Sequence, residues 1–254
     1  MAIPLFFIGH WYLSLFSQTF FLHRYSAHRM FTLNKFWERF FWIFTYITQG
    51  ASFLNPRGYA ILHRLHHIHS DSAQDPHSPR HSTNIFTMMW RTKKMYEGYV
   101  NNKIHASNEV EANIPQWKGF EKFAESGFSR IAWGTLYVLF YIYFAGSDWW
   151  WYPLLLVHFI IGPVHGAIVN WFGHWLGYRN FKNNDDSRNT LPMDVLMMGE
   201  LFQNNHHHHP LKINFAVKWF ELDPTWQIMK LLNFLKIIKL KRSKEKTIQT
   251  PVNN

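Results

Sequence analysis

A long, nearly uncharged run opens the chain and restricts the folds that it can adopt. Residues 2–22 are apolar apart from His10, Ser14, Gln18 and a few aromatic or hydroxyl groups. A helix of this length crosses the hydrocarbon core of a bilayer. The run has neither the basic start nor the small-residue cleavage site of a secretory signal, so we expect a spanning helix over residues 2–22.

A second membrane element is predicted over residues 131–173. The apolar runs 131–146 and 149–173 are separated only by Ser147 and Asp148, which is the pattern of a helical hairpin. Three consecutive tryptophans begin the second run, and Trp favours the membrane–water interface. We therefore expect this turn at the far face of the membrane.

Other apolar segments are predicted to lie along the membrane surface. Residues 40–54 are short for a span and are followed by Asn55 and Pro56. From Pro210 onward, apolar positions alternate with Trp and Lys, as in interfacial amphipathic helices. The predicted fold class is an all-α integral membrane protein. Helix 2–22 and hairpin 131–173 cross the membrane, and the histidine motifs form a cap on its cytosolic side together with the interfacial helices.

Composition supports this environment and excludes several kinds of site. Charged residues are 17% of the chain, against about 25% in average proteins, and aromatic residues are 19%. The formal charge of +10 is clustered beside apolar segments, which indicates anionic lipid rather than nucleic acid as the partner. Because cysteine is absent, a disulfide framework, an iron–sulfur cluster and a thiolate zinc site are excluded.

One domain is expected, because no linker rich in Pro, Gly or Ser divides the chain. We predict a single membrane-embedded domain over residues 1–243. The polar residues 244–254 are predicted to form a disordered tail.

Histidines recur in three clusters whose spacing suits metal binding. Residues three or four apart share one face of a helix, so His63, His66 and His67 converge. The same spacing groups two further sets, which are Gln203 with His206 and His207, and Asn170 with His174. A metal here must take nitrogen or oxygen ligands.

The first cluster has a different spacing. His23 and His28 are five residues apart, so on an ideal α-helix their side chains diverge by roughly 140°. They would then reach two different metals or straddle the end of the first helix. All three clusters share one face of the membrane only if residues 40–54 do not cross it, and that topology is required for a common site.

Five runs resemble the membrane fatty acid desaturases, in particular the stearoyl-CoA or acyl-lipid delta-9 group. They are HRYSAH from His23, HRLHH from His63, DPHS from Asp75, NWFGH from Asn170 and GELFQNNHHHHP from Gly199. One such motif alone is a weak signal. The ordered set covers most of the chain and is specific.

The resemblance implies a di-iron centre. Its ligands would be His23, His28, His63, His66, His67, His174, His206 and His207, with Asn170 acting on one iron through water. Gln203 is counted with them as a weaker, neutral ligand, with a water or a supporting hydrogen bond as the alternative at that position. No catalytic residue beyond these ligands is expected. Independently, no Glu is followed by His three residues later, which argues against a carboxylate-bridged di-iron bundle, and the HExxH motif of zinc proteases is missing.

Two features depart from the delta-9 pattern. Gln203 stands where most delta-9 members have histidine. Front-end desaturases resemble this chain in having Gln there, but they usually carry a fused cytochrome b5 domain that this sequence lacks. The family generally has two crossings before the first histidine motif, whereas one precedes His23, so either the start is shortened or an upstream start was missed.

The other histidines have simpler interpretations. We expect His10, His158 and His165 to be buried hydrogen-bonding residues of membrane helices. Loop or supporting roles are expected for a further set, which comprises His69, His77, His81 and His105. His208 and His209 are expected to be spectators, since Pro210 disfavours helix just before it.

The resemblance implies an oxygen-dependent enzyme that inserts a cis double bond, of delta-9 type, into a saturated acyl chain. The substrate would be an acyl-CoA or an acyl-lipid, held in a narrow apolar tunnel that sets the position of the bond. Electrons would come from an external ferredoxin or cytochrome b5, because no nucleotide-binding fingerprint or haem motif is present.

Two alternatives stay open at this stage. A fatty acyl or lipid hydroxylase of the same histidine chemistry would rebind oxygen to the carbon instead of removing a second hydrogen. A membrane protein that carries or senses zinc would also be rich in histidine, but its ligands should lie within the spanning helices.

Overall fold

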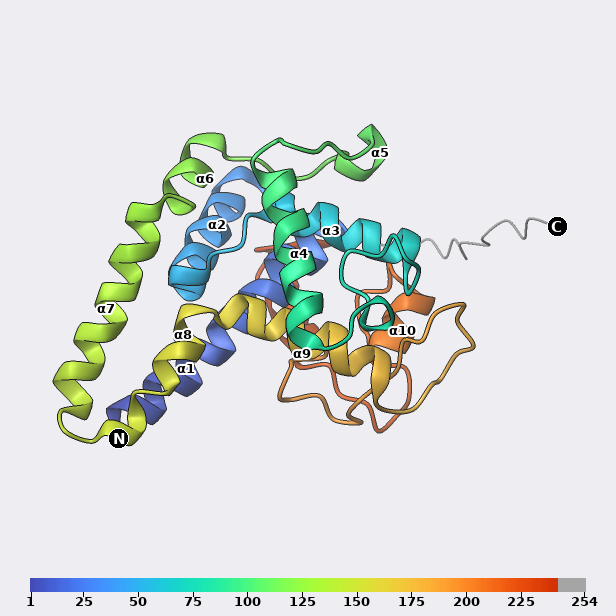
Figure 1. Ribbon diagram of the computed structural model, residues 1–254. Helices are drawn as coiled ribbons and strands as arrows, with labels where there is room; N and C mark the ends of the chain where they lie inside the picture. The colour runs from blue at the N-terminus through green and yellow to red at the C-terminus, as the bar shows by residue number, and fades with distance from the viewer. Residues whose placement is uncertain (242–254) are drawn as a thin grey trace.

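The computed structural model describes residues 1–241, and this part of the chain is mostly helical (Figure 1). The predicted disordered tail, residues 244–254, and the last two residues of the predicted domain lie outside the described residues. The all-α integral membrane class predicted from the sequence is confirmed.

Two described helices are long and apolar enough to span a bilayer. The first joins α1 (Ala2–Ser17) to η1 (Gln18–Ala27), giving 26 residues, and the second is α7 (Gly127–Ala145). A third span is possible by length and composition if one bent pair is counted as a unit. It joins η4 (Trp149–Trp151) and α8 (Leu154–Phe159) to α9 (Ile161–Trp175) with a bend of 74°. The predicted helix and hairpin are therefore present, with the bend as an unpredicted feature.

The end of the first span is a π-helix, and this corrects the geometry expected for its histidines. In η1 the backbone N–H of His28 donates to the carbonyl of His23, five residues back, over 3.1 Å. The Ser26 hydroxyl donates to the Phe21 carbonyl over the same spacing. Because a π-helix bonds residue i to i+5, residues five apart lie on one face. His23 and His28 therefore point the same way, and the divergence expected for an α-helix does not occur.

Helix α2 (Lys35–Gln49) packs along the first span and is not among the candidate spans. The Asn34 side chain caps it by accepting from Trp37 N–H. It ends at Gly50, whose φ of +50° and contact with the Tyr137 hydroxyl leave no room for a Cβ. The short η2 (Gly50–Ser52) then leads to the helix that carries the second histidine motif. The position of residues 40–54 at the membrane surface stays a prediction.

Helix α3 (Pro56–His69) begins where the sequence places its signals. The Asn55 side chain accepts hydrogen bonds from Arg57 and Gly58 N–H groups, and Pro56 takes the first helical position. The helix lies against η1, so that the first two histidine motifs are neighbours.

The remaining elements complete the cap. They are η3 (Pro79–His81), α4 (Ile85–Val100), α5 (Asn108–Glu111), α6 (Lys118–Ala124), α10 (Gln203–His208) and α11 (Pro224–Phe234). Strands β1 (Phe31–Thr32) and β2 (Lys239–Leu240) form a short antiparallel pair that the sequence did not predict. Of the amphipathic helices expected after Pro210, α11 is present, while residues 209–223 are irregular.

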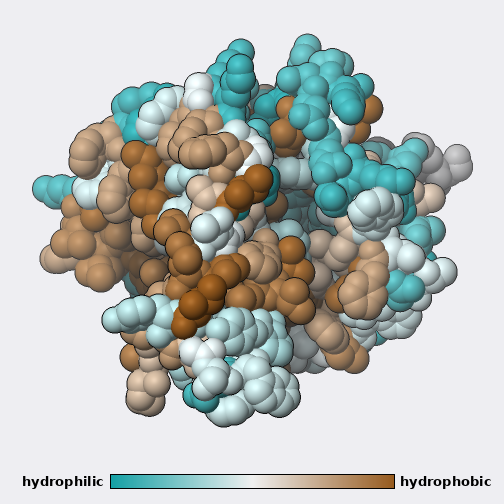
Figure 2. Space-filling model, turned by 60° about the vertical axis from the view of Figure 1, so that its left-hand side comes forward, coloured by the Kyte–Doolittle hydropathy of each residue, from teal (hydrophilic) through white to brown (hydrophobic). Residues whose placement is uncertain are grey.

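Apolar side chains cover the outside of the spanning helices. On α7, Ile131 is 71% exposed and Ile142 is 55% exposed. Figure 2 shows such side chains gathered over one part of the surface, with hydrophilic side chains concentrated at another end. Exposed apolar surface of this extent requires a non-aqueous environment. The core below the cap is aromatic instead, with Phe20, Phe21 and Trp42 fully buried.

Candidate metal centre

The three histidine clusters meet in one place. Helix η1 supplies His23 and His28, α3 supplies the second motif, α9 supplies His174, and α10 supplies His206 and His207. Figure 1 shows why residues so distant in sequence become neighbours, since α3, α9 and α10 come together at one end of the molecule. All eight of the imidazoles predicted from sequence lie in this assembly.

The ring nitrogens form two groups. In the first, the Nε2 atoms of His28 and His63 are 2.7 Å apart, and those of His23 and His206 are 3.0 Å apart. His67 joins this group, because its Nε2 lies 3.0 Å from that of His63 and 2.9 Å from that of His206. Five imidazoles thus direct nitrogen atoms toward one small volume.

The second group comprises His66, His174 and His207. The Nε2 atoms of His66 and His207 are 3.1 Å apart. One nitrogen from each of the three rings lies within 4.8 Å of the others. The His174 Nε2 is buried and has no hydrogen-bond partner within residues 1–241.

Carboxylates orient four of these rings from behind. His66 Nδ1 lies 2.8 Å from Asp75, His174 Nδ1 2.8 Å from Asp71, and His207 Nδ1 2.7 Å from Asp185. In the first group, His23 Nδ1 lies 2.6 Å from Glu200. A carboxylate at Nδ1 places the ring proton there and leaves Nε2 free to act as a metal ligand.

The carboxylates are themselves held in place. Asp71 accepts from Ser78 and from the backbone N–H of Asp186. Glu200 lies 3.4 Å from the buried Arg24 guanidinium and also accepts from Thr19. Such supports fix the ring orientation before any ligand binds.

Electrostatics keep most of the imidazoles neutral. Burial, followed by the neighbouring imidazoles, lowers the pKa far below its ordinary value in His28, His63, His67 and His206. His66 is an exception, because Asp75 raises its pKa despite burial. Burial raises the pKa of Asp71, but the hydrogen bond from His174 and its charge outweigh this and hold the pKa at about 2.

This arrangement fits metal cations. Neutral imidazoles with the proton on Nδ1 turn nitrogen lone pairs toward one another at about hydrogen-bond distance, and the low pKa values disfavour a shared proton. A cation among the lone pairs removes the repulsion, and all-imidazole sets suit iron, copper, nickel or zinc. Two separate groups of nitrogens match two ions.

Asn170 and Gln203 are placed beside this assembly. Both line the cavity described below. The Gln203 amide nitrogen donates to the Glu200 carbonyl over 2.6 Å, and its side chain packs on Gly173, where a Cβ would approach its Cγ to 2.5 Å. The part of Gln203 left to face a metal is its amide oxygen.

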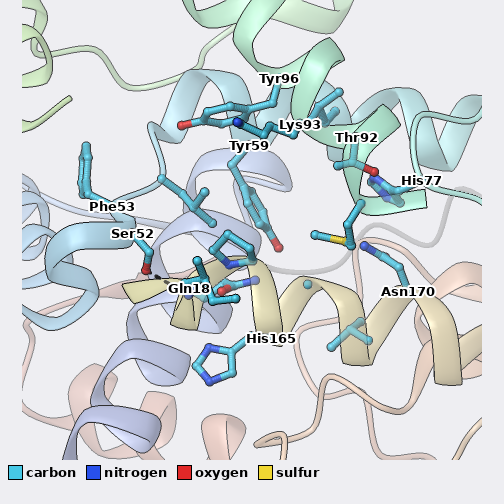
Figure 3. A pocket seen from close by; sticks show the side chains of 18 of the residues that line it. Gln18, Ser52, Phe53, Tyr59, His77, Thr92, Lys93, Tyr96, His165 and Asn170 are labelled. Atoms are coloured by element: carbon cyan, nitrogen blue, oxygen red, sulfur yellow. Dashed lines mark hydrogen bonds between the residues drawn. The ribbon is translucent and has the colours of Figure 1, made fainter. Parts of the chain in front are cut away.

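A cavity of about 890 Å³ adjoins the histidines. Figure 3 shows its wall, with His77 and Asn170 on one side, Tyr59 and Tyr96 above, and Gln18 and His165 below. Most of its remaining lining comes from η2, α4 and α9, with further residues from neighbouring helices. Apolar side chains predominate, and charged groups such as Lys93, Glu97 and Arg130 also face it. The volume suits a long acyl chain.

Comparison with known proteins decides the family. A model described as fatty acid desaturase matches residues 1–233. The chain belongs to this family.

Three relatives illustrate which desaturases this chain is similar to. Delta-9 desaturase-like 5 protein of Arabidopsis thaliana is 31% identical over 227 residues, covering 88% of this chain and 71% of the relative. The sn-1 stearoyl-lipid 9-desaturase of Anabaena variabilis is 30% identical over 217 residues, covering 84% and 74%. Acyl-CoA C20 Delta5-desaturase of Anemone leveillei is 28% identical over 225 residues, covering 87% and 67%.

The resemblance seen in the motifs is thereby confirmed, and the desaturase is an oxidoreductase and a membrane enzyme of lipid metabolism that acts on a fatty acyl chain. The names of the relatives differ in bond position and in acyl carrier. These two properties are therefore not transferred to the desaturase.

The other histidines of the desaturase partly follow the sequence-based expectation. His10 and His158 are hydrogen-bonded, with Nδ1 atoms 2.6 Å apart and the Tyr141 hydroxyl 2.9 Å from His158 Nε2. His165 departs from it, because both of its ring nitrogens are buried without a hydrogen-bond partner among the described residues.

The loop histidines lie near the site or at the surface. His77 is buried beside His66, with ring centroids 4.4 Å apart. His208 stacks on Phe181, away from both groups of nitrogens. His81 contacts the Asp71 carbonyl through its ring.

The orienting carboxylates are the functional residues that sequence reasoning missed. Asp75 and Glu200 were noticed only as parts of motifs, and Asp71 and Asp185 were not singled out. A usable signal existed, since Asp71 and Asp75 directly follow the second motif and metal-binding histidines commonly donate to a carboxylate.

Proposed function

We propose that this desaturase is of delta-9 type and inserts a cis double bond into a saturated acyl chain through two histidine-bound iron ions. The strongest support is that two groups of imidazoles converge at the wall of a cavity large enough for an acyl chain. Carboxylates orient four of these imidazoles. The family supplies the reaction class, and the donor set supplies the preference for nitrogen-bound metal.

Two sets of residues would hold the ions. The first ion would be bound by His23, His28, His63, His67 and His206, and the second by His66, His174 and His207, with Asn170 and Gln203 beside it. Bound iron would supply the activation of O2 and the oxidising power of the reaction. In balance, the acyl CH2–CH2 unit becomes CH=CH, an external donor gives two electrons, the solvent gives two protons, and O2 is reduced to two waters.

The chain's own task is to hold and position. Carboxylates keep the imidazoles in one orientation, so little reorganisation is needed when metal charge changes. An unfunctionalised methylene offers no polar group for the enzyme to bind, so the cavity must select it by holding the whole acyl chain in place. The cavity also excludes water from the reaction. Tyr59 lies at this junction, lining the cavity while stacking on His63 with ring centroids 6.0 Å apart.

The partners follow from this chemistry. The substrate is an acyl-CoA or acyl-lipid, and the electron donor is a ferredoxin or cytochrome b5 that docks on the histidine face. That face is proposed to be cytoplasmic, in keeping with the basic loops near it.

Expression in a host that lacks the matching double bond tests the proposal. Gas chromatography and mass spectrometry of host lipids should show a new cis-alkene at carbon 9, and purified protein should contain iron. We expect His67→Ala and His174→Ala to abolish the product while the protein still inserts in membranes.

A matched control is His105→Ala, because His105 is exposed and remote from the ring groups. It should keep full product. Undiminished alkene in His67→Ala or His174→Ala would reject the ligand assignment, a hydroxy acid without alkene would favour the hydroxylase, and tightly bound zinc without iron would reject the iron centre.

A further inference from the structure

The wall of the acyl cavity contains polar groups that a plain hydrocarbon chain does not satisfy. His165 on α9 is fully buried, lines the cavity, and has no hydrogen-bond partner for either ring nitrogen within residues 1–241. A buried imidazole without partners is costly, because the ring loses its water and gains nothing in return. A purely apolar residue would suit a saturated chain better at this position.

A second such group lies beside it on the neighbouring helix. Gln18 is 5% exposed, lines the same cavity, and its Oε1 has no hydrogen-bond partner among the described residues. The oxygen is therefore the atom that remains available to a ligand.

Gln18 lies against α9, the helix that carries His165, so both side chains belong to the same stretch of the wall. A Cβ built on Gly166, the residue after His165, would lie 4.0 Å from the Gln18 amide nitrogen. Trp11 on α1 packs against His165 in an edge-on contact, with 4.6 Å between ring centroids. Figure 3 shows Gln18 and His165 on the same side of the cavity. Because Gln18 is five residues before His23 in η1, this stretch lies one π-helical turn from the metal centre.

The chemistry of the two groups selects among polar ligands. An unpartnered amide oxygen accepts and cannot donate, so the ligand must bring an O–H or N–H donor. An imidazole carries one donor and one acceptor, so the same ligand atom can also accept from His165. A hydroxyl meets both demands, whereas a ketone, an epoxide or an alkene offers no donor to Gln18.

We propose that Gln18 and His165 form a hydroxyl-binding subsite, and that the desaturase acts on acyl chains that carry a hydroxyl group. This inference rests on the proposed function and names its substrate class. The hydroxyl would fix which carbons of the chain lie at the metal centre. A plain methylene chain has no such contact, so only the depth to which it enters the cavity would position it. A site with groups reserved for a hydroxyl discriminates strongly against the analogue that lacks it.

Equilibrium binding to the full-length protein in lipid nanodiscs tests the subsite without requiring turnover. Stearic acid and a series of hydroxystearic acids, with the hydroxyl on different carbons, would compete with a fluorescent fatty acid. We expect one positional isomer to bind about tenfold more tightly than stearic acid, as one or two satisfied buried hydrogen bonds allow.

Variants assign that preference to the two residues. His165→Leu and Gln18→Met should each reduce the ratio to near one, and His165→Gln, which keeps a donor and an acceptor, should retain part of it. Val169→Leu is the matched control, because Val169 lines the same cavity one helical turn away and is apolar. It should alter the affinity for both acids but not their ratio.

Two results would overturn the inference. One is that every hydroxystearic acid binds no better than stearic acid, which would mean that water satisfies these groups. The other is a preference that survives both His165→Leu and Gln18→Met. The wild-type comparison decides the matter even if a variant fails to fold. Failure of the proposed function would appear separately, as an absence of new alkene in the expression assay.

Discussion

Each imidazole of the second group has a carboxylate behind it, and this pairing explains how isolated side chains become a site. His66, His174 and His207 donate through Nδ1 to Asp75, Asp71 and Asp185. Helical spacing predicted which rings could converge, because residues three and four apart share a face. Helical spacing did not predict how the rings are oriented. The carboxylates that orient them lie in loops, and loop conformation does not follow from a sequence period.

Two adjacent aspartates allow this role to be tested. Asp185 holds His207, whereas the side chain of Asp186 forms a salt bridge of 2.6 Å with Arg80 near the surface. We expect Asp185→Asn to lower metal affinity by about 10- to 100-fold, because the amide oxygen is a weaker acceptor for the ring N–H. Asp186→Asn should leave it nearly unchanged. Metal content after dialysis against graded chelator measures both, and equal losses would contradict the orienting role.

Gln203 is the residue whose role the sequence left most open. Its amide nitrogen donates to the Glu200 carbonyl. Its side chain packs tightly on Gly173, where a larger residue would not fit. If the amide oxygen serves the metal, Gln203→His should retain more desaturase activity than Gln203→Ala, because imidazole also offers a ligand atom. Product formed per iron bound is the measurement. Equal activity of the two variants would make the position a bystander.

At the scale of elements, the departures from expectation all concern how helices bend and bond. The apolar runs predicted the spans, but apolar periodicity does not distinguish an α-helix from a π-helix over ten residues. The π-helix η1 is what turns His23 and His28 to one side. The bend between α8 and α9 lies at Ile160, whose backbone leaves the helical conformation, and hydropathy alone does not report it.

The junction of α6 and α7 carries a prediction about pH. Burial, then the Glu121 carboxylate, raises the pKa of Glu125 to about 7, above its ordinary value of 4.5, although Arg130 opposes the change. Below pH 4.5 the folded and unfolded carboxyl groups are both protonated. Between pH 4.5 and about 7 the unfolded chain ionises while the folded one keeps its proton, so stability falls across this range and levels off above it.

Glu125→Gln should remove this dependence. We expect the variant to be more stable than the wild type by about 1 kcal/mol at pH 8, a figure reduced for solvent screening of the partly exposed group. At pH 5 the two should differ little. Thermal unfolding in detergent at both pH values measures this, with Asp148→Asn at the exposed far end of α7 as the control. A stability difference that is the same at pH 5 and pH 8 would contradict the assignment.

For the whole molecule, sequence reasoning succeeded where one physical constraint acted on many residues. Three histidine clusters had to share a membrane face, and this alone required residues 40–54 to remain at the surface. The histidine clusters do meet, and α2 is not among the candidate spans of the described residues, so the surface position of this segment stays the prediction that this geometry requires. The cavity lining was beyond prediction, because its residues come from nine separate elements and the loops between them, with no common spacing.

The basic loops near the histidine face predict the orientation of the protein in the membrane, and the absence of cysteine makes the test direct. The α7–α8 turn should face away from the cytoplasm, and the loop after α3 should face it. In spheroplasts of an expressing bacterium, a membrane-impermeant maleimide should therefore label Ser147→Cys, while Ala73→Cys should react only after permeabilisation. Both positions are exposed, so differences in burial do not account for unequal labelling. Labelling of both variants from outside would place the turn and the metal centre on one face, which is incompatible with α7 and the α8–α9 pair as spans.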